Sequence, residues 1–90
     1  MDYLHRELDL NAGDVVEVTL DSPANVILLD PPNFSAYQQR TPYHYFGGHA
    51  RRSPVRLTAP REGTWHLVVD LGGYAGRVRA GIRVLQEATS

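Results

Sequence analysis

Apolar and polar residues alternate over much of the chain, which is typical of β-strands with one buried face. Residues 14–20 alternate in this way, with Val16 and Val18 on the apolar side. Residues 64–71 show the clearest alternation, and Trp65 lies on their apolar side. We therefore expect two strands that face the core here, with Trp65 as a core residue.

Residues 25–30 form a continuous apolar run instead of an alternating one. A short run of this kind predicts a strand that is buried on both faces. Pro31 and Pro32 end the run, because neither has a backbone N–H to donate to a sheet.

Residues 77–85 also alternate, and the glycine-rich stretch before them predicts a hairpin with residues 64–71. Two registers keep the apolar residues of both strands on one face, and they set Asp70 opposite Arg79 or opposite Arg77. In either register, Asp70 lies opposite an arginine on the outer face. It is predicted either to pair with that arginine or to accept hydrogen bonds from the backbone amides of the glycine-rich loop.

The remaining elements are marked less sharply. Residues 4–10 are predicted to be a first strand, although the spacing of Leu4 and Leu8 also fits a helix. Residues 55–57 are predicted to be a short strand, and Pro54 favours an edge position or a strand start for it. Residues 33–40 are the helical candidate, with Asn33 as the N-cap.

These elements predict an all-β fold: an antiparallel β-sandwich of about seven strands, with jelly-roll-like or Greek-key connections and one short helical turn. The 90 residues suffice for one hydrophobic core. We expect a single domain over residues 1–86 and a frayed tail over residues 87–90.

Composition narrows the possible functions. Nine arginines stand against ten carboxylates, and the net charge of -1 argues against a nucleic-acid partner. The chain has no cysteine, so it forms neither a disulfide nor a thiolate zinc site. No apolar run is long enough for a membrane helix and no secretory signal is visible, so we expect a cytoplasmic protein.

The segment 43–49 combines aromatic rings and imidazoles with two glycines and is predicted to be extended over residues 43–46. Rings can stack on a ligand and glycines let it approach the backbone, but the same residues also suit a strand end followed by a turn. With the 33–37 turn and the 72–76 loop, this segment is the candidate site. The predicted ligand-binding residues are Asn33, Tyr37, Tyr45, Gly47, Gly48, His49, Gly72 and Gly73.

Other chemistry is less favoured by the sequence. The histidines lack the spacing of a metal site and no nucleophile motif is present, so we expect no metal, no cofactor and no catalytic activity. The 72–76 loop could bind an anion through its amides, but a wide hairpin loop explains it better. Arg77, Arg79 and Arg83 form either a patch for an acidic partner or the solvated face of a sheet.

Residues 25–37, 45–49 and 63–74 together resemble the bacterial domain-of-unknown-function 1883 family. The most specific pieces are Tyr-Phe-Gly-Gly-His and Asp-Leu-Gly-Gly, and the resemblance extends over roughly residues 1–85. It implies a compact β-rich fold with no assigned activity. Similar domains occur beside signalling domains of the TIR type, which would suit a sensing or docking module.

The sequence therefore predicts a non-catalytic binding or protein-interaction module for an unknown protein or small molecule, as a monomer or a weak homo-oligomer. Two alternatives stay open. One is a self-associating module that pairs through an edge strand such as residues 53–58. The other is a small hydrolase or metal-dependent enzyme.

Overall fold

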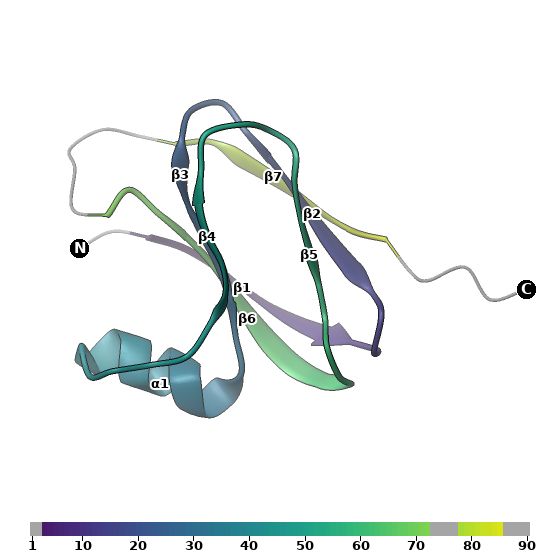
Figure 1. Cartoon of the computed structure of the whole chain (residues 1–90), viewed down its shortest axis with the longest axis vertical. Coiled ribbons are helices and arrows are strands. Elements are labelled where there is room, and N and C mark those ends of the chain that lie inside the picture. The colour runs from purple at the N-terminus through teal and green to yellow at the C-terminus, as the bar shows by residue number, and fades with distance from the viewer. Residues whose placement is uncertain (1–2, 73–77, 86–90) are drawn as a thin grey trace, which may run out of the picture.

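The computed structural model describes residues 3–72 and 78–85. These residues form seven strands and one helix, and the strands make two antiparallel sheets packed face to face (Figure 1). The elements are β1 (Tyr3–Leu10), β2 (Val15–Leu20), β3 (Ala24–Leu29), α1 (Pro31–Gln39), β4 (Phe46–Ala50), β5 (Val55–Thr58), β6 (Gly63–Asp70) and β7 (Ala80–Leu85).

The larger sheet has the strand order β1-β6-β3-β4, and the smaller sheet has the order β5-β2-β7. Among the described strands, only β3 and β4 are neighbours both along the chain and within a sheet. The helix α1 connects them and lies against the outer face of the larger sheet (Figure 1). The predicted β-sandwich is therefore confirmed, with a helix of nine residues where a short helical turn was expected.

The main core lies between the sheets, where alternation predicted it. Val16 and Val18 of β2 are fully buried, and Trp65 of β6 is 2% exposed. They belong to one cluster with Leu67 and Val69, the next apolar positions of β6. The pattern of apolar residues thus identified the buried face of both strands.

β3 is buried on both faces, as its continuous apolar run predicted. Val26 and Leu28 belong to the core between the sheets. Ile27 and Leu29 point the other way and pack with Phe34 of α1. The helix is therefore the layer that covers the second face of this strand.

The predicted hairpin between residues 64–71 and 77–85 is wrong. β6 pairs with β1 and β3, whereas β7 pairs with β2 in the other sheet. Asp70 lies opposite Tyr3 and Asn25, not opposite an arginine. Alternation identifies the buried face of a strand, but a sandwich has two inner faces, and the pattern does not say which sheet the strand joins.

The helix begins earlier than predicted, because its N-cap is Asp30 and not Asn33. The Asp30 carboxylate accepts a hydrogen bond from the backbone N–H of Asn33 at 3.0 Å. Pro31 and Pro32 occupy the first helical positions, where a missing N–H leaves no hydrogen bond unmade. The same prolines that end β3 therefore start α1.

The strand predicted at residues 43–46 begins further along the chain, as β4. β5 is an edge strand that begins directly after Pro54, as predicted.

α1, the only helix in the described part of the chain, is neither long nor apolar enough to cross a membrane.

Candidate functional site

Four tyrosines form a continuous row of ring contacts beside α1. The ring of Tyr37 lies 5.3 Å from that of Tyr3 and 5.4 Å from that of Tyr43, in both cases nearly at right angles. Tyr43 lies 5.7 Å from Tyr45. We call these residues the aromatic row. Tyr45 is 50% exposed and the others are half-buried, so the row is accessible from solvent.

The aromatic row is anchored through Tyr37 to the carboxylate of Asp70, which is 6% exposed at the end of β6. Asp70 accepts hydrogen bonds from the Tyr37 hydroxyl at 2.6 Å and from the Asn25 amide at 2.9 Å. It also accepts one from the backbone N–H of Gly72 at 2.8 Å. Nδ1 of His49 lies 3.2 Å from Oδ1 of Asn25, within hydrogen-bonding distance. These five residues are the Asp70 cluster.

The Asp70 cluster connects α1 to the ends of β3 and β6. Burial, together with the hydrogen bond to Asp70, raises the pKa of Tyr37. Burial and the nearby Asp70 charge raise the pKa of Tyr43 as well. Both phenols therefore keep their protons at neutral pH, and Tyr37 acts as a permanent donor to the carboxylate.

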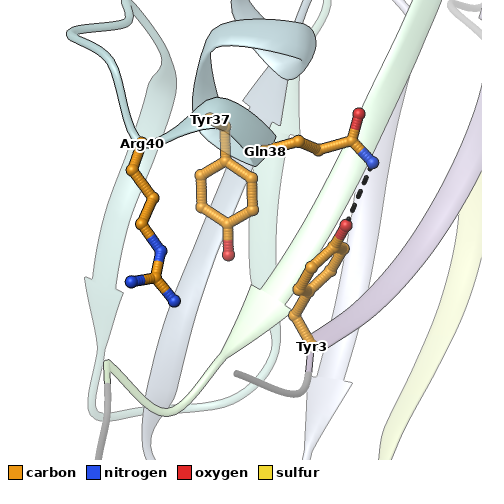
Figure 2. Close-up of a pocket in the computed structure, with 4 residues that line it drawn as sticks. All are labelled: Tyr3, Tyr37, Gln38 and Arg40. Atoms are coloured by element: carbon orange, nitrogen blue, oxygen red, sulfur yellow. Dashed lines mark hydrogen bonds between the residues drawn. The ribbon is translucent and has the colours of Figure 1, made fainter.

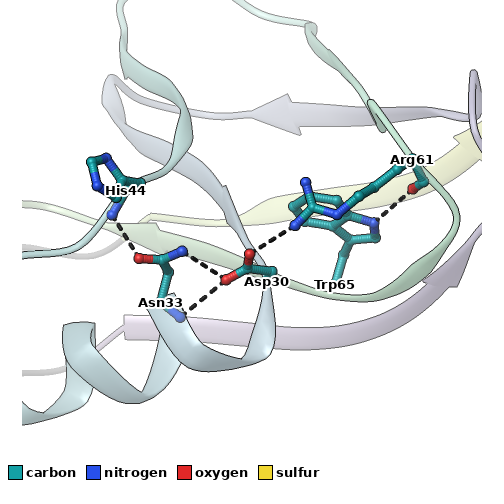
Figure 3. Close-up of polar contacts among 5 residues, drawn as sticks. All are labelled: Asp30, Asn33, His44, Arg61 and Trp65. Carbon is teal, nitrogen blue, oxygen red and sulfur yellow. Dashed lines mark hydrogen bonds and ion pairs between the residues drawn. The ribbon is translucent and has the colours of Figure 1, made fainter.

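A second polar cluster forms where α1 begins (Figure 3). Oδ1 of Asp30 accepts hydrogen bonds from the backbone and side-chain amides of Asn33 at 3.0 and 2.7 Å, and Oδ2 accepts one from Arg61 at 2.8 Å. The backbone N–H of His44 donates to Oδ1 of Asn33 at 2.8 Å. The Arg61 guanidinium lies 4.8 Å from the centre of the Trp65 ring. These five residues are the Asp30 cluster.

The Asp30 cluster fixes the position of one cationic side chain. Burial acts to raise the pKa of Asp30, but the hydrogen bonds from Asn33 and the charge of Arg61 outweigh it and lower the pKa. The ionised carboxylate therefore holds the guanidinium, and the Arg61 side chain is still 58% exposed. Among the described residues, only one guanidinium nitrogen of Arg61 has a hydrogen-bond partner, so other N–H groups are available to a ligand.

A cavity of about 340 Å³ opens beside the Asp30 cluster. Tyr45 and Phe46 line it and are 50% and 46% exposed. Phe46 meets the Trp65 ring edge-on, with centroids 5.9 Å apart. The other lining residues are Leu28, Asp30, Asn33, His44, Arg61 and Trp65. Exposed rings and fixed polar groups thus share one hollow, which is typical of ligand-binding sites.

Two further cavities lie on the Tyr37 side of the aromatic row. One of about 290 Å³ is lined by Tyr3, Tyr37, Gln38 and Arg40, and Figure 2 shows the Gln38 amide donating to the Tyr3 hydroxyl, at 3.2 Å. The other, of about 600 Å³, is a wide opening also lined by Tyr37 and Arg40. Residues of the aromatic row therefore line all three of these cavities.

The glycines of the predicted site differ in whether the backbone requires a glycine at that position. Gly47 has a φ of 112°, and a Cβ there would collide with the carbonyl oxygen of Val26, so the fold itself requires this glycine. A Cβ on Gly48 would meet nothing within 4 Å. Gly72 has a φ of 66°, which glycine adopts readily and which directs its N–H to Asp70. Gly73 lies outside the described residues.

The structure divides the predicted site residues into separate groups. Tyr37, His49 and Gly72 meet in the Asp70 cluster. Asn33 and Tyr45 line the cavity beside the Asp30 cluster. Gly47 and Gly48 lie in β4. Tyr43, which lies between Tyr37 and Tyr45, connects the first two groups through the aromatic row.

The outer face of the smaller sheet carries part of the predicted arginine stripe. Arg83 lies opposite Glu17 on β2 and binds its carboxylate at 2.8 Å, while Arg56 binds the same carboxylate at 3.0 Å. Burial acts to raise the pKa of Glu17, but hydrogen bonds from both arginines lower it. Arg83 therefore belongs to a cross-strand ion pair on a sheet face, and Arg77 lies outside the described residues.

Sequence reasoning missed the cavity because its residues come from distant segments. Asp30 was placed at the end of a strand, although Asp-Pro-Pro-Asn is a helix-start signal that could have revealed the cap. No local pattern brings Arg61 to Asp30, and Trp65 was expected to serve packing alone. Within residues 3–72 and 78–85, no three His, Asp or Glu side chains gather closely enough to hold a metal ion.

Comparison with known proteins gives one match. No curated protein and no solved structure matches the chain. A family model matches residues 1–88, which is nearly the whole sequence. The chain belongs to the family described as Domain of unknown function (DUF1883).

Proposed function

We propose that this protein is a non-catalytic binding module whose ligand occupies the cavity beside the Asp30 cluster. The observation that carries the proposal is the exposure of two adjacent rings, Tyr45 and Phe46, beside a guanidinium that is already held in place. Adjacent exposed rings at a hollow are typical of recognition surfaces, because packing alone would bury them.

The chemistry of the cavity indicates the kind of ligand. Arg61 is held by the Asp30 carboxylate and by the Trp65 ring, so little side-chain freedom is lost when a ligand binds. Its free N–H groups suit hydrogen-bond acceptors such as carbonyl, hydroxyl or carboxylate oxygens. Tyr45 and Phe46 suit a flat or apolar group next to those acceptors.

Binding is favoured over catalysis because the polar groups of the Asp30 cluster are engaged in holding one another. Asp30 caps a helix and pairs with Arg61, and Asn33 holds the backbone of His44. We also propose a bacterial setting, which rests on the family resemblance, and a cytoplasmic location, which rests on the apolar pattern of the sequence.

A thermal-shift screen against sugars, nucleotides and aromatic carboxylates tests the proposal, because a ligand of the folded state raises Tm. Titration calorimetry of each hit then compares Tyr45→Ala with Leu4→Ala, whose side chains are 50% and 43% exposed in the native protein. We expect Tyr45→Ala to weaken binding by about 5- to 30-fold and Leu4→Ala to leave it unchanged. Hits that bind both variants equally would place the ligand elsewhere.

A further inference from the structure

β4 differs from the other edge strands in carrying no charged residue. Edge strands expose unpaired backbone groups, and soluble proteins commonly protect them with charges or proline. The described edges β1, β5 and β7 are protected in this way. Their protecting residues are Arg6, Glu7 and Asp9 on β1, Pro54 and Arg56 at β5, and Arg83 on β7. β4 reads Phe-Gly-Gly-His-Ala, and its Phe46 is 46% exposed. The nearest charges, Arg51 and Arg52, follow the strand and lie outside it.

At the centre of β4, no described residue occupies the space next to Gly48. Gly47 is required by close contact with β3, but a Cβ on Gly48 would meet no atom within 4 Å. A glycine inside a strand often marks a place where another backbone approaches closely. His49 leaves the edge open as well, since its ring is within hydrogen-bonding distance of Asn25 on β3.

We propose that β4 pairs with β4 of a second copy of this chain, so that the larger sheets of both copies become continuous. Antiparallel pairing about a two-fold axis at Gly48 sets Gly48 opposite its own copy. It sets Phe46 opposite Ala50 of the other copy, and no like charges oppose each other. The strand is thus complementary to itself.

The β5 edge is less suited to the same role. Proline directly before the strand and Arg56 within it both oppose pairing with a further strand. The self-association predicted through residues 53–58 is therefore better assigned to β4, the neighbouring edge of the other sheet.

Sedimentation equilibrium of the ligand-free protein, over a wide concentration range, tests the pairing. We expect a monomer–dimer equilibrium. Phe46→Lys places a charge on the β4 edge, and because the two-fold axis repeats each contact, we expect the dissociation constant to rise by about tenfold or more. Leu4→Lys is the matched control, since Leu4 is 43% exposed on the β1 edge of the same sheet, and it should dimerise like the native protein.

Hydrogen exchange of the native protein provides a measurement that does not depend on any variant. We expect the outward amides of β4 to gain protection as concentration rises, while those of β1 do not. The proposal is overturned if the protein stays monomeric up to a concentration of about 1 mM, since even a weak dimer would form by then. A dimer that Leu4→Lys disrupts, or one that leaves the β4 amides unprotected, overturns it as well, because another surface would then form the contact. None of these three results bears on ligand binding in the cavity, since no ligand is present.

Discussion

Two aspartates lie near the two ends of α1, and their surroundings differ in a way that separates structure from recognition. Asp70 is buried and held by neutral donors from α1, β3 and the residue Gly72. Asp30 is partly exposed and held by an arginine and by the start of the helix it caps. One carboxylate closes a junction between elements, while the other holds a cation that faces an open cavity.

The two clusters also differ in how readily their hydrogen-bond partners can be exchanged. Each donor to Asp70 would be left without an acceptor in a buried site, so any rearrangement there is costly. Arg61 is mostly exposed, and water or a ligand can replace part of its contact with Asp30 at little cost. We therefore assign packing to the Asp70 cluster and recognition to the Asp30 cluster.

The largest expected effect is at Trp65, which belongs to the core and also lines the cavity. Trp65→Ala should lower the free energy of unfolding by about 3–5 kcal/mol, because the buried ring leaves a large void. Urea denaturation measures the loss, with Tyr45→Ala as an exposed-ring control that should cost less than about 1 kcal/mol. A cost below about 1 kcal/mol for Trp65→Ala would contradict its place in the core.

The same conservative change at the two aspartates tests the comparison directly. Asp70→Asn replaces one acceptor oxygen with a donor, leaving buried donors unsatisfied, and should cost about 2–3 kcal/mol. Asp30→Asn keeps a good N-cap and loses only an exposed ion pair, so it should cost less than about 1 kcal/mol. Urea denaturation of both variants measures the two losses in free energy of unfolding. Equal losses would remove the distinction between the clusters.

The sequence predicted the buried faces of the strands better than it predicted the clusters. Val16, Val18 and Trp65 could be assigned to the core because burial follows a local period along each strand. Asp70 was assigned an arginine partner because the sheet that each strand joins is not encoded in that period. Two of its donors, Tyr37 and Asn25, come from segments that meet only once both sheets and the helix are in place. The third donor, the backbone N–H of Gly72, is a loop amide two residues away, which the sequence had left open as the alternative.

Removing the cap itself should have a smaller effect than altering Asp70. Asp30→Ala deletes the acceptor for the backbone N–H of Asn33 and should lower the free energy of unfolding by about 1 kcal/mol. The same variant frees Arg61, so binding of any cavity ligand should weaken as well. Circular dichroism during denaturation measures the first effect and calorimetry the second. Unchanged binding would show that the position of Arg61 does not matter.

The two ends of α1 also differ in backbone strain. Arg40 ends the helix with a φ of 61°. Among the described residues, it is the only one other than glycine that has a positive φ. Glycine adopts this conformation without a steric penalty, although it gains freedom in the unfolded state. Arg40→Gly should therefore raise the free energy of unfolding by about 0.5–1 kcal/mol. A lower stability would show that the Arg40 side chain contributes more than its backbone costs.

The smallest effect is the pH dependence of His66, which lies on β6 between Trp65 and Asp70. Burial and the nearby His5 lower the pKa of His66, and the two rings are within hydrogen-bonding distance at 2.7 Å, with Phe34 stacked on both. The unfolded chain then binds more protons below about pH 6.5, so stability should fall as pH drops through this window. Denaturation midpoints between about pH 7.5 and 5 measure the slope. His66→Gln should flatten it and the control His44→Gln should keep it, whereas a slope that survives His66→Gln would assign the titration to another group.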